Sequence, residues 1–110
     1  MARLSKQQVI KTPLKTEEVD VPEWGGSVLV SEIPVAKRNE LFGRYIDENG
    51  KPVMSMQLYL DMFVAGCVEP AFTMEEASGF SHKPVELVAK AALKLNGLGG
   101  DGADEARGNS

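Results

Sequence analysis

The sequence predicts an α+β fold, an N-terminal β-hairpin packed against a small helical bundle of three main helices plus one short helix. Apolar residues alternate with polar ones between residues 16 and 33, as in strands, whereas from residue 34 onward they recur every three or four positions, as in helices. The length of 110 residues allows one hydrophobic core. We therefore expect a single domain over residues 1–97 and a disordered, glycine-rich acidic tail over residues 98–110.

The hairpin is predicted from two short runs that are rich in valine and separated by the segment PEWGG. Each run places two valines two positions apart: Val19 and Val21, then Val28 and Val30. Alternating β-branched residues favour strands. Pro22 cannot donate to a strand ladder, and the paired glycines suit a turn. Residues 22–27 are therefore expected to form the hairpin loop.

An amphipathic helix is predicted from Pro34, because proline suits the first helical position. The segment VAKRNELFGRYIDENG has an apolar side that should be buried: Leu41, Phe42, Tyr45 and Ile46. Its charged residues should face water: Lys37, Arg38, Glu40 and Arg44. The pair Asn49-Gly50 then signals a turn.

The segment Met54–Val68, MSMQLYLDMFVAGCV, is the most apolar part of the chain. It is too long for a typical strand and too short to cross a bilayer, so we expect a central helix in the core. Ser55 is the expected N-cap. Gln57 and Asp61 stand four residues apart and should mark the only face in contact with water.

Three further signals concern the end of this helix and the segment after it. Gly66 costs helix stability and suggests that a close neighbour packs there. Pro70 should end the helix. Thr73 and Glu76 match a capping box for a short helix over residues 74–78.

The last helix is predicted from Pro84 in its first turn to the stop signal Asn96-Gly97. Its apolar residues recur at helical spacing and should face the core: Val85, Val88, Ala92 and Leu95.

The chain has few of the groups that catalytic and metal sites need. It contains one histidine, His82, and one cysteine, Cys67, so the usual N and S ligands of a zinc site cannot be assembled. Cys67 lies in the most apolar segment, where a thiol normally packs, and His82 is expected in a solvated loop. Glu75 and Glu76 suit a helix N-terminus better than a catalytic pair. We expect no enzyme activity, cofactor or metal.

Charge is unevenly distributed along the chain. Residues 1–15 carry four basic residues and no acid, whereas residues 16–23 carry four acids and no base. A solvated basic tail is the more frequent arrangement, and contact with an acidic partner or nucleic acid is the alternative. The net charge of −4 argues against nucleic acid as the main partner. Without a long apolar run or a secretory signal, we expect no membrane association and a cytoplasmic location.

A partner-binding surface is the remaining expectation. Thioether side chains suit surfaces that fit variable apolar partners, although core filling is their more frequent use. Trp24, the only tryptophan, would either cover one end of the core or stand exposed as an anchor. Methionines gather in or beside the central helix: Met54, Met56, Met62 and Met74. The candidate contact residues are Trp24, Met54, Met56 and Met74.

The segment KTEEVDVPEWGGSVLVSEIPVAKRNELF resembles the N-terminal signature of tail assembly chaperones of long-tailed, siphovirus-type bacteriophages and prophages. The resemblance continues through the apolar central helix, the F-T-x-E-E capping box at Phe72–Glu76 and the ending KLNGLG at Lys94–Gly99. It covers roughly residues 14–99, which is most of the chain.

The resemblance implies a non-enzymatic role in tail assembly. Such a protein would bind the tape measure protein, help to recruit tail tube protein, and leave before the tail is complete. It would then act in the cytoplasm of the bacterial host and be absent from the mature virion. A homo-oligomer is compatible with this role. Two alternatives remain open, a small structural virion protein of the tail or head–tail connector and a nucleic-acid-binding regulator that uses the basic N-terminal residues.

Overall fold

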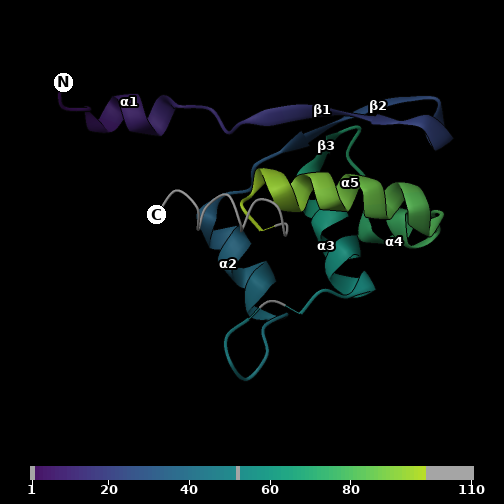
Figure 1. Ribbon diagram of the computed structural model, residues 1–110. Helices are drawn as coiled ribbons and strands as arrows, with labels where there is room; N and C mark the ends of the chain where they lie inside the picture. Colours follow the sequence, from purple (N-terminus) through teal and green to yellow (C-terminus); the bar gives the residue numbers. More distant parts are fainter. Residues whose placement is uncertain (1, 52, 99–110) are drawn as a thin grey trace.

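The computed structural model describes residues 2–51 and 53–98 and has an α+β fold (Figure 1). Its elements follow in this order: α1 (Lys6–Lys11), β1 (Thr16–Val21), the 3-10 helix η1 (Pro22–Trp24), β2 (Gly26–Ser31), α2 (Val35–Gly43), α3 (Met56–Gly66), β3 (Cys67–Glu69), α4 (Met74–Ser78) and α5 (His82–Leu95). The predicted fold class is confirmed, with three elements, α1, η1 and β3, that the sequence pattern did not predict.

The predicted hairpin is present, and it is part of a three-stranded antiparallel sheet in the order β1-β2-β3. Strands β1 and β2 pair from Thr16 opposite Ser31 to Val21 opposite Gly26. The loop between them is the short helix η1, which ends at Gly25 with a φ of 70°. A positive φ is easy for glycine because it has no Cβ.

The prediction that the central helix extends to Val68 is wrong, because α3 ends at Gly66 and the next residues form β3. Cys67 is extended, with φ −82° and ψ 112°, and β3 pairs with the second edge of β2, where Leu29 is opposite Glu69. Strand pairing satisfies backbone donors and acceptors that the edge of β2 would otherwise leave open. The start of the helix agrees with prediction, since the Ser55 hydroxyl accepts the Leu58 N–H at 3.2 Å.

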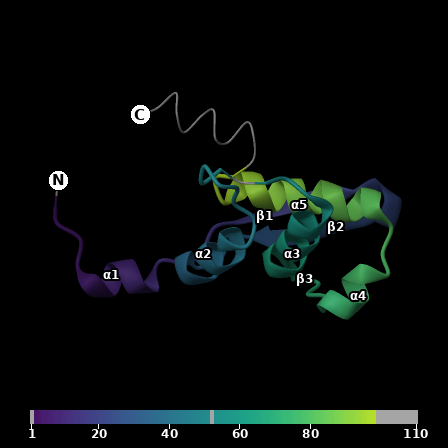
Figure 2. The same ribbon diagram turned by 90° about the horizontal axis from the view of Figure 1, so that it is seen from below.

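Helices α3 and α5 pack against one face of the sheet, and the core lies between these two layers (Figures 1 and 2). The sheet contributes valines and the helices contribute mostly larger side chains: Val21, Val28 and Val30 from the sheet, and Leu58, Met62, Phe63, Val88 and Leu93 from the helices. The two helices approach closely, because a Cβ added at Gly66 would lie 2.8 Å from the Cβ of Ala92. The close neighbour expected at this glycine is therefore in α5.

Helix α2 is shorter than predicted, since Pro34 is its N-cap rather than its first residue and the helix ends at Gly43. Leu41 and Phe42 are buried as expected, but Ile46 is 51% exposed, so its predicted burial is wrong. Beyond the helix the chain forms a loop in which the Asp47 carboxylate accepts the N–H groups of Asn49 and Lys51 at 2.8 and 2.9 Å. Ile46 thus lies beyond the end of the helix, in a segment that does not continue the buried helical face.

The capping box before α4 is confirmed, since the Thr73 hydroxyl accepts the Glu76 N–H and the Glu76 carboxylate accepts the Thr73 N–H. Helix α5 begins at His82, two residues earlier than predicted. His82 is thus the exposed first residue of a helix, where a solvated loop was expected.

Helix α5 stops at the expected signal. The N–H groups of Gly97 and Leu98 donate to the carbonyls of Lys94 and Leu93 at 3.0 and 2.7 Å. This pair of bonds is a Schellman motif, and the apolar residue that follows the glycine normally packs back on the helix. Leu98, assigned to the tail from sequence, is half-buried against the core. The rest of the predicted tail, residues 99–110, lies outside the described residues.

The basic N-terminal residues, expected to be a solvated tail, contain the six-residue helix α1, and none of its residues is buried. None of the helices in the described ranges combines the length and apolar character that crossing a bilayer requires.

Candidate partner-binding surface

An apolar hollow lies where α3, α4 and the start of α5 meet. Its rim includes Met56, which is 48% exposed, and the floor is mostly apolar. The lining residues come from all three helices and the turn before α5: Met56, Gln57, Leu60, Ala77, Ser78, Phe80, His82 and Val85. A flexible thioether at the edge of an apolar hollow suits contact with an apolar side chain of variable shape.

Trp24 belongs to an aromatic cluster beside this hollow. Its ring centroid lies 6.0, 6.2 and 5.6 Å from those of Phe63, Phe72 and Phe80, each in edge-to-face geometry. The indole therefore covers one end of the core, and it remains 38% exposed. Phe80 belongs to both groups and joins the aromatic cluster to the hollow.

The structure does not bring all four candidate residues together. Met74, 39% exposed, lines a separate hollow with Val64 and Arg44. Met54, 47% exposed, lies in the segment before α3. Met62 is fully buried and fills the core.

Sequence reasoning missed Phe80, which joins the hollow to the aromatic cluster. Ser81 is the N-cap of α5, so Phe80 and Val85 occupy the positions that form a hydrophobic staple across a helix start. The spacing was a usable signal. It was missed because the helix was predicted to begin at Pro84.

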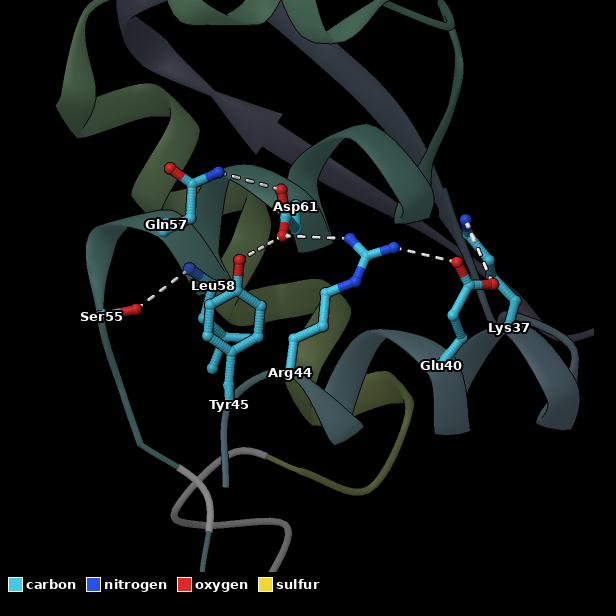
Figure 3. A network of polar contacts seen from close by, with 8 residues as sticks. All are labelled: Lys37, Glu40, Arg44, Tyr45, Ser55, Gln57, Leu58 and Asp61. Carbon is cyan, nitrogen blue, oxygen red and sulfur yellow. Dashed lines mark hydrogen bonds and ion pairs between the residues drawn. The ribbon is translucent and has the colours of Figure 1, made fainter. Parts of the chain in front are cut away.

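On another side of α3, Asp61 is buried, so the prediction that it faces water is wrong. The Tyr45 hydroxyl donates to its Oδ2, the Gln57 Nε2 donates to its Oδ1 at 3.2 Å, and the Arg44 Nη1 lies 4.0 Å away (Figure 3). A buried carboxylate needs such partners. Arg44 also bonds Glu40 at 2.9 Å, so the network links α2 to α3.

One member of the network, Tyr45, also has a raised pKa. Burial, and then the hydrogen bond to Asp61, raises the pKa of the Tyr45 phenol above its ordinary value of 10.0. A phenol is protonated at neutral pH in any case, and the raised pKa of Tyr45 extends its donation to the carboxylate to higher pH. The network attaches the start of the loop after α2 to α3, which is a structural role.

The two residues with the greatest catalytic potential, Cys67 and His82, lie in different environments. Cys67 is buried at the start of β3, its Sγ lies 3.3 Å from the Pro70 carbonyl, and burial raises the pKa of its thiol. His82 is exposed at the start of α5. Within residues 2–51 and 53–98, no group of three or more His, Cys, Asp and Glu side chains is arranged to hold a metal ion.

No family model matches this chain, and neither a curated protein nor a solved structure matches it.

Proposed function

We propose that this chain is a tail assembly chaperone of a long-tailed bacteriophage or prophage, which binds the tape measure protein and assists assembly of the tail tube around it. The sequence resemblance over roughly residues 14–99 motivates the proposal. In keeping with it, the PEWGG segment is the turn of a hairpin, and α2 follows directly after β2.

The apolar region around Met56, Phe80 and Trp24 is the observation that carries the proposal. A chaperone for a long helical protein must cover apolar stripes that would otherwise associate. Helices bind grooves through apolar residues at spacings of three and four, and a hollow flanked by a flexible methionine can accept one such residue. Leu60 and Val85 supply further apolar surface in the same hollow.

The test is co-expression with the tape measure protein, followed by capture and measurement of its soluble fraction. Met56→Ser should leave the melting temperature nearly unchanged, because the side chain is 48% exposed, yet it should abolish most of the capture. Leu87→Ser is the matched control, since Leu87 is 40% exposed on α5 and lies outside the hollow. Trp24→Ala is a poor probe, because removing the indole also disrupts the aromatic cluster.

Salt dependence separates apolar from charged contacts. Capture should weaken little between about 0.05 and 0.5 M salt, whereas contacts between exposed charges are screened over that range. Full capture by a folded Met56→Ser protein, or a tape measure protein that stays insoluble with the wild-type chain, would contradict the proposal.

The fate of the protein distinguishes the chaperone from a structural virion protein. We expect it in the host cytoplasm during assembly and not in purified virions. Stoichiometric amounts in virions, measured by mass spectrometry, would favour the structural alternative.

A further inference from the structure

The N-terminal arm, defined here as residues 2–14, exposes apolar side chains that the rest of the described chain does not cover. Four large apolar side chains are open to solvent: Leu4 at 75%, Val9 at 56%, Ile10 at 63% and Leu14 at 48%. Helix α1 has only six residues, and isolated helices shorter than about 12–15 residues are marginal in water. A capping box between Ser5 and Gln8 helps, but it does not cover the apolar side chains. The arm therefore needs a surface to pack on.

The arm is held away from its own domain. Lys15 is fixed to the end of β2, because its N–H donates to the Glu32 carboxylate at 2.7 Å and its carbonyl accepts the Glu32 N–H at 2.8 Å. Just before it, Pro13 disfavours a helical Thr12, which is extended with φ −67° and ψ 122°. Both views show α1 projecting beyond the end of the sheet (Figures 1 and 2). The arm therefore projects away from the sheet of its own chain.

Charge indicates which surface fits the arm. Residues 1–15 carry four bases and no acid, so the rest of the chain holds eight bases against sixteen acids. In the arm, Lys6 precedes Val9 and Ile10 by three and four residues, which places it on the same side of α1. The surface that fits has an apolar centre flanked by carboxylates.

The sheet face opposite the helices has that character. Leu29 pairs with Glu18 of β1 on one side and with Glu69 of β3 on the other, so the three side chains form a row across the sheet. They line a hollow that Pro70 also borders. Helices α3 and α5 pack against the other face of the sheet (Figure 1). In the row, Glu18 and Glu69 are exposed and Leu29 is half-buried.

We propose that the arm docks on this outer sheet face of a second copy of the chain, by reciprocal exchange of arms in a twofold dimer. Val9 and Ile10 cover Leu29, while Lys6 and Lys11 lie near Glu18 and Glu69. Exchange uses the same contact twice, since each copy gives an arm and receives one. The inference is independent of the tape measure protein.

The test is sedimentation of the full chain in low salt with two charge-reversed variants. Lys6→Glu with Lys11→Glu puts acids on the arm, and Glu18→Lys with Glu69→Lys puts bases on the sheet face. The wild type should be a dimer that weakens as salt rises. Each variant alone should be a monomer, because its arm and sheet face then carry the same charge.

The mixture of the two variants is the decisive sample. In a mixed pair both contacts are complementary, because the acidic arm of one variant meets the basic sheet face of the other, and the basic arm of the second meets the acidic sheet face of the first. An equimolar mixture should therefore recover the dimer. Lys83→Glu with Lys94→Glu is the matched control: it makes the same charge change on α5 and should stay dimeric. Thermal melts of each variant check that the fold is retained.

Several outcomes would overturn the inference. A monomeric wild type, a dimer that persists in both folded variants, or a mixture that stays monomeric would each do so. An arm that folds back on its own sheet would leave the mixture monomeric. A monomeric wild type that binds DNA through Lys6 and Lys11 would instead favour the regulator alternative.

Discussion

Gly66→Ala tests how closely α3 and α5 pack. The new methyl group would lie 2.8 Å from the Cβ of Ala92, nearer than real Cβ atoms approach one another, whereas its next neighbours, the Ser31 carbonyl and a Val30 methyl, lie at 3.8 Å. The Ala92 Cβ has no rotamer through which to move aside. The two helices must therefore shift apart, and this disturbs the packing between α3 and α5 in the core.

Two opposing effects set the size of the change. Alanine in place of a helical glycine stabilises the folded state by about 0.5–1 kcal/mol. Overpacking a well-filled core costs about 1–3 kcal/mol. We expect overpacking to dominate, with a net loss of about 1–2 kcal/mol and a fall in melting temperature of roughly 5–10 °C.

Chemical and thermal denaturation of matched variants would measure this. Gly43→Ala is the control, since Gly43 also lies in a helix but a Cβ there meets nothing within 4 Å; it should be neutral or stabilising by up to about 1 kcal/mol. Ala92→Gly should relieve the contact, so that the double variant is more stable than the sum of the single changes by about 1–2 kcal/mol. A Gly66→Ala protein as stable as the wild type, or strict additivity, would refute the reasoning.

Three further changes test the core, the polar network and the C-terminal stop. Phe63→Ala removes a fully buried ring and should cost about 3–5 kcal/mol in thermal denaturation; an unchanged melting temperature would mean that the core is misplaced. Tyr45→Phe leaves buried Asp61 without one donor and should cost about 1–3 kcal/mol. The pKa of Tyr45 is raised in the folded state, so the phenol ionises first in the unfolded chain. The free energy of unfolding of the wild type should therefore fall as pH rises above 10.0. Urea melts and phenolate absorbance should show this fall in the wild type and not in Tyr45→Phe. Truncation after Leu98 should preserve the thermal transition, whereas truncation after Gly97 should cost about 1 kcal/mol, since it removes the 2.7 Å bond to Leu93.

The hairpin and helix starts were predictable because their signals are local. Alternating valines, the glycine turn and the hydroxyl caps at Ser55 and Thr73 act within a few residues, and the structure confirms each one. The Asn96-Gly97 stop is equally local. Gly66 is the exception. A glycine that weakens the helix indicated a close neighbour, and in the structure that neighbour is Ala92 of α5.

The features that the sequence did not predict depend on distant partners. Residues 67–69 continue an apolar helical pattern, and only pairing with β2 makes them a strand. Asp61 has the spacing of a polar helix edge, and only the early end of α2 at Gly43 brings Tyr45 over it. The same early end leaves Ile46 exposed.

The two proposed contact surfaces lie on opposite faces of the sheet. The Met56 hollow is among the helices, whereas the row of Glu18, Leu29 and Glu69 is on the face that the helices leave open. Arm exchange would therefore leave both hollows of a dimer accessible, and a dimer could hold two segments of one long helical partner, with avidity beyond that of a single site. The Lys6→Glu and Lys11→Glu protein should then still capture the tape measure protein, but more weakly than the wild type, whereas Met56→Ser should lose capture and stay dimeric. If either variant lost both capture of the tape measure protein and dimer formation, the two surfaces would not be separate.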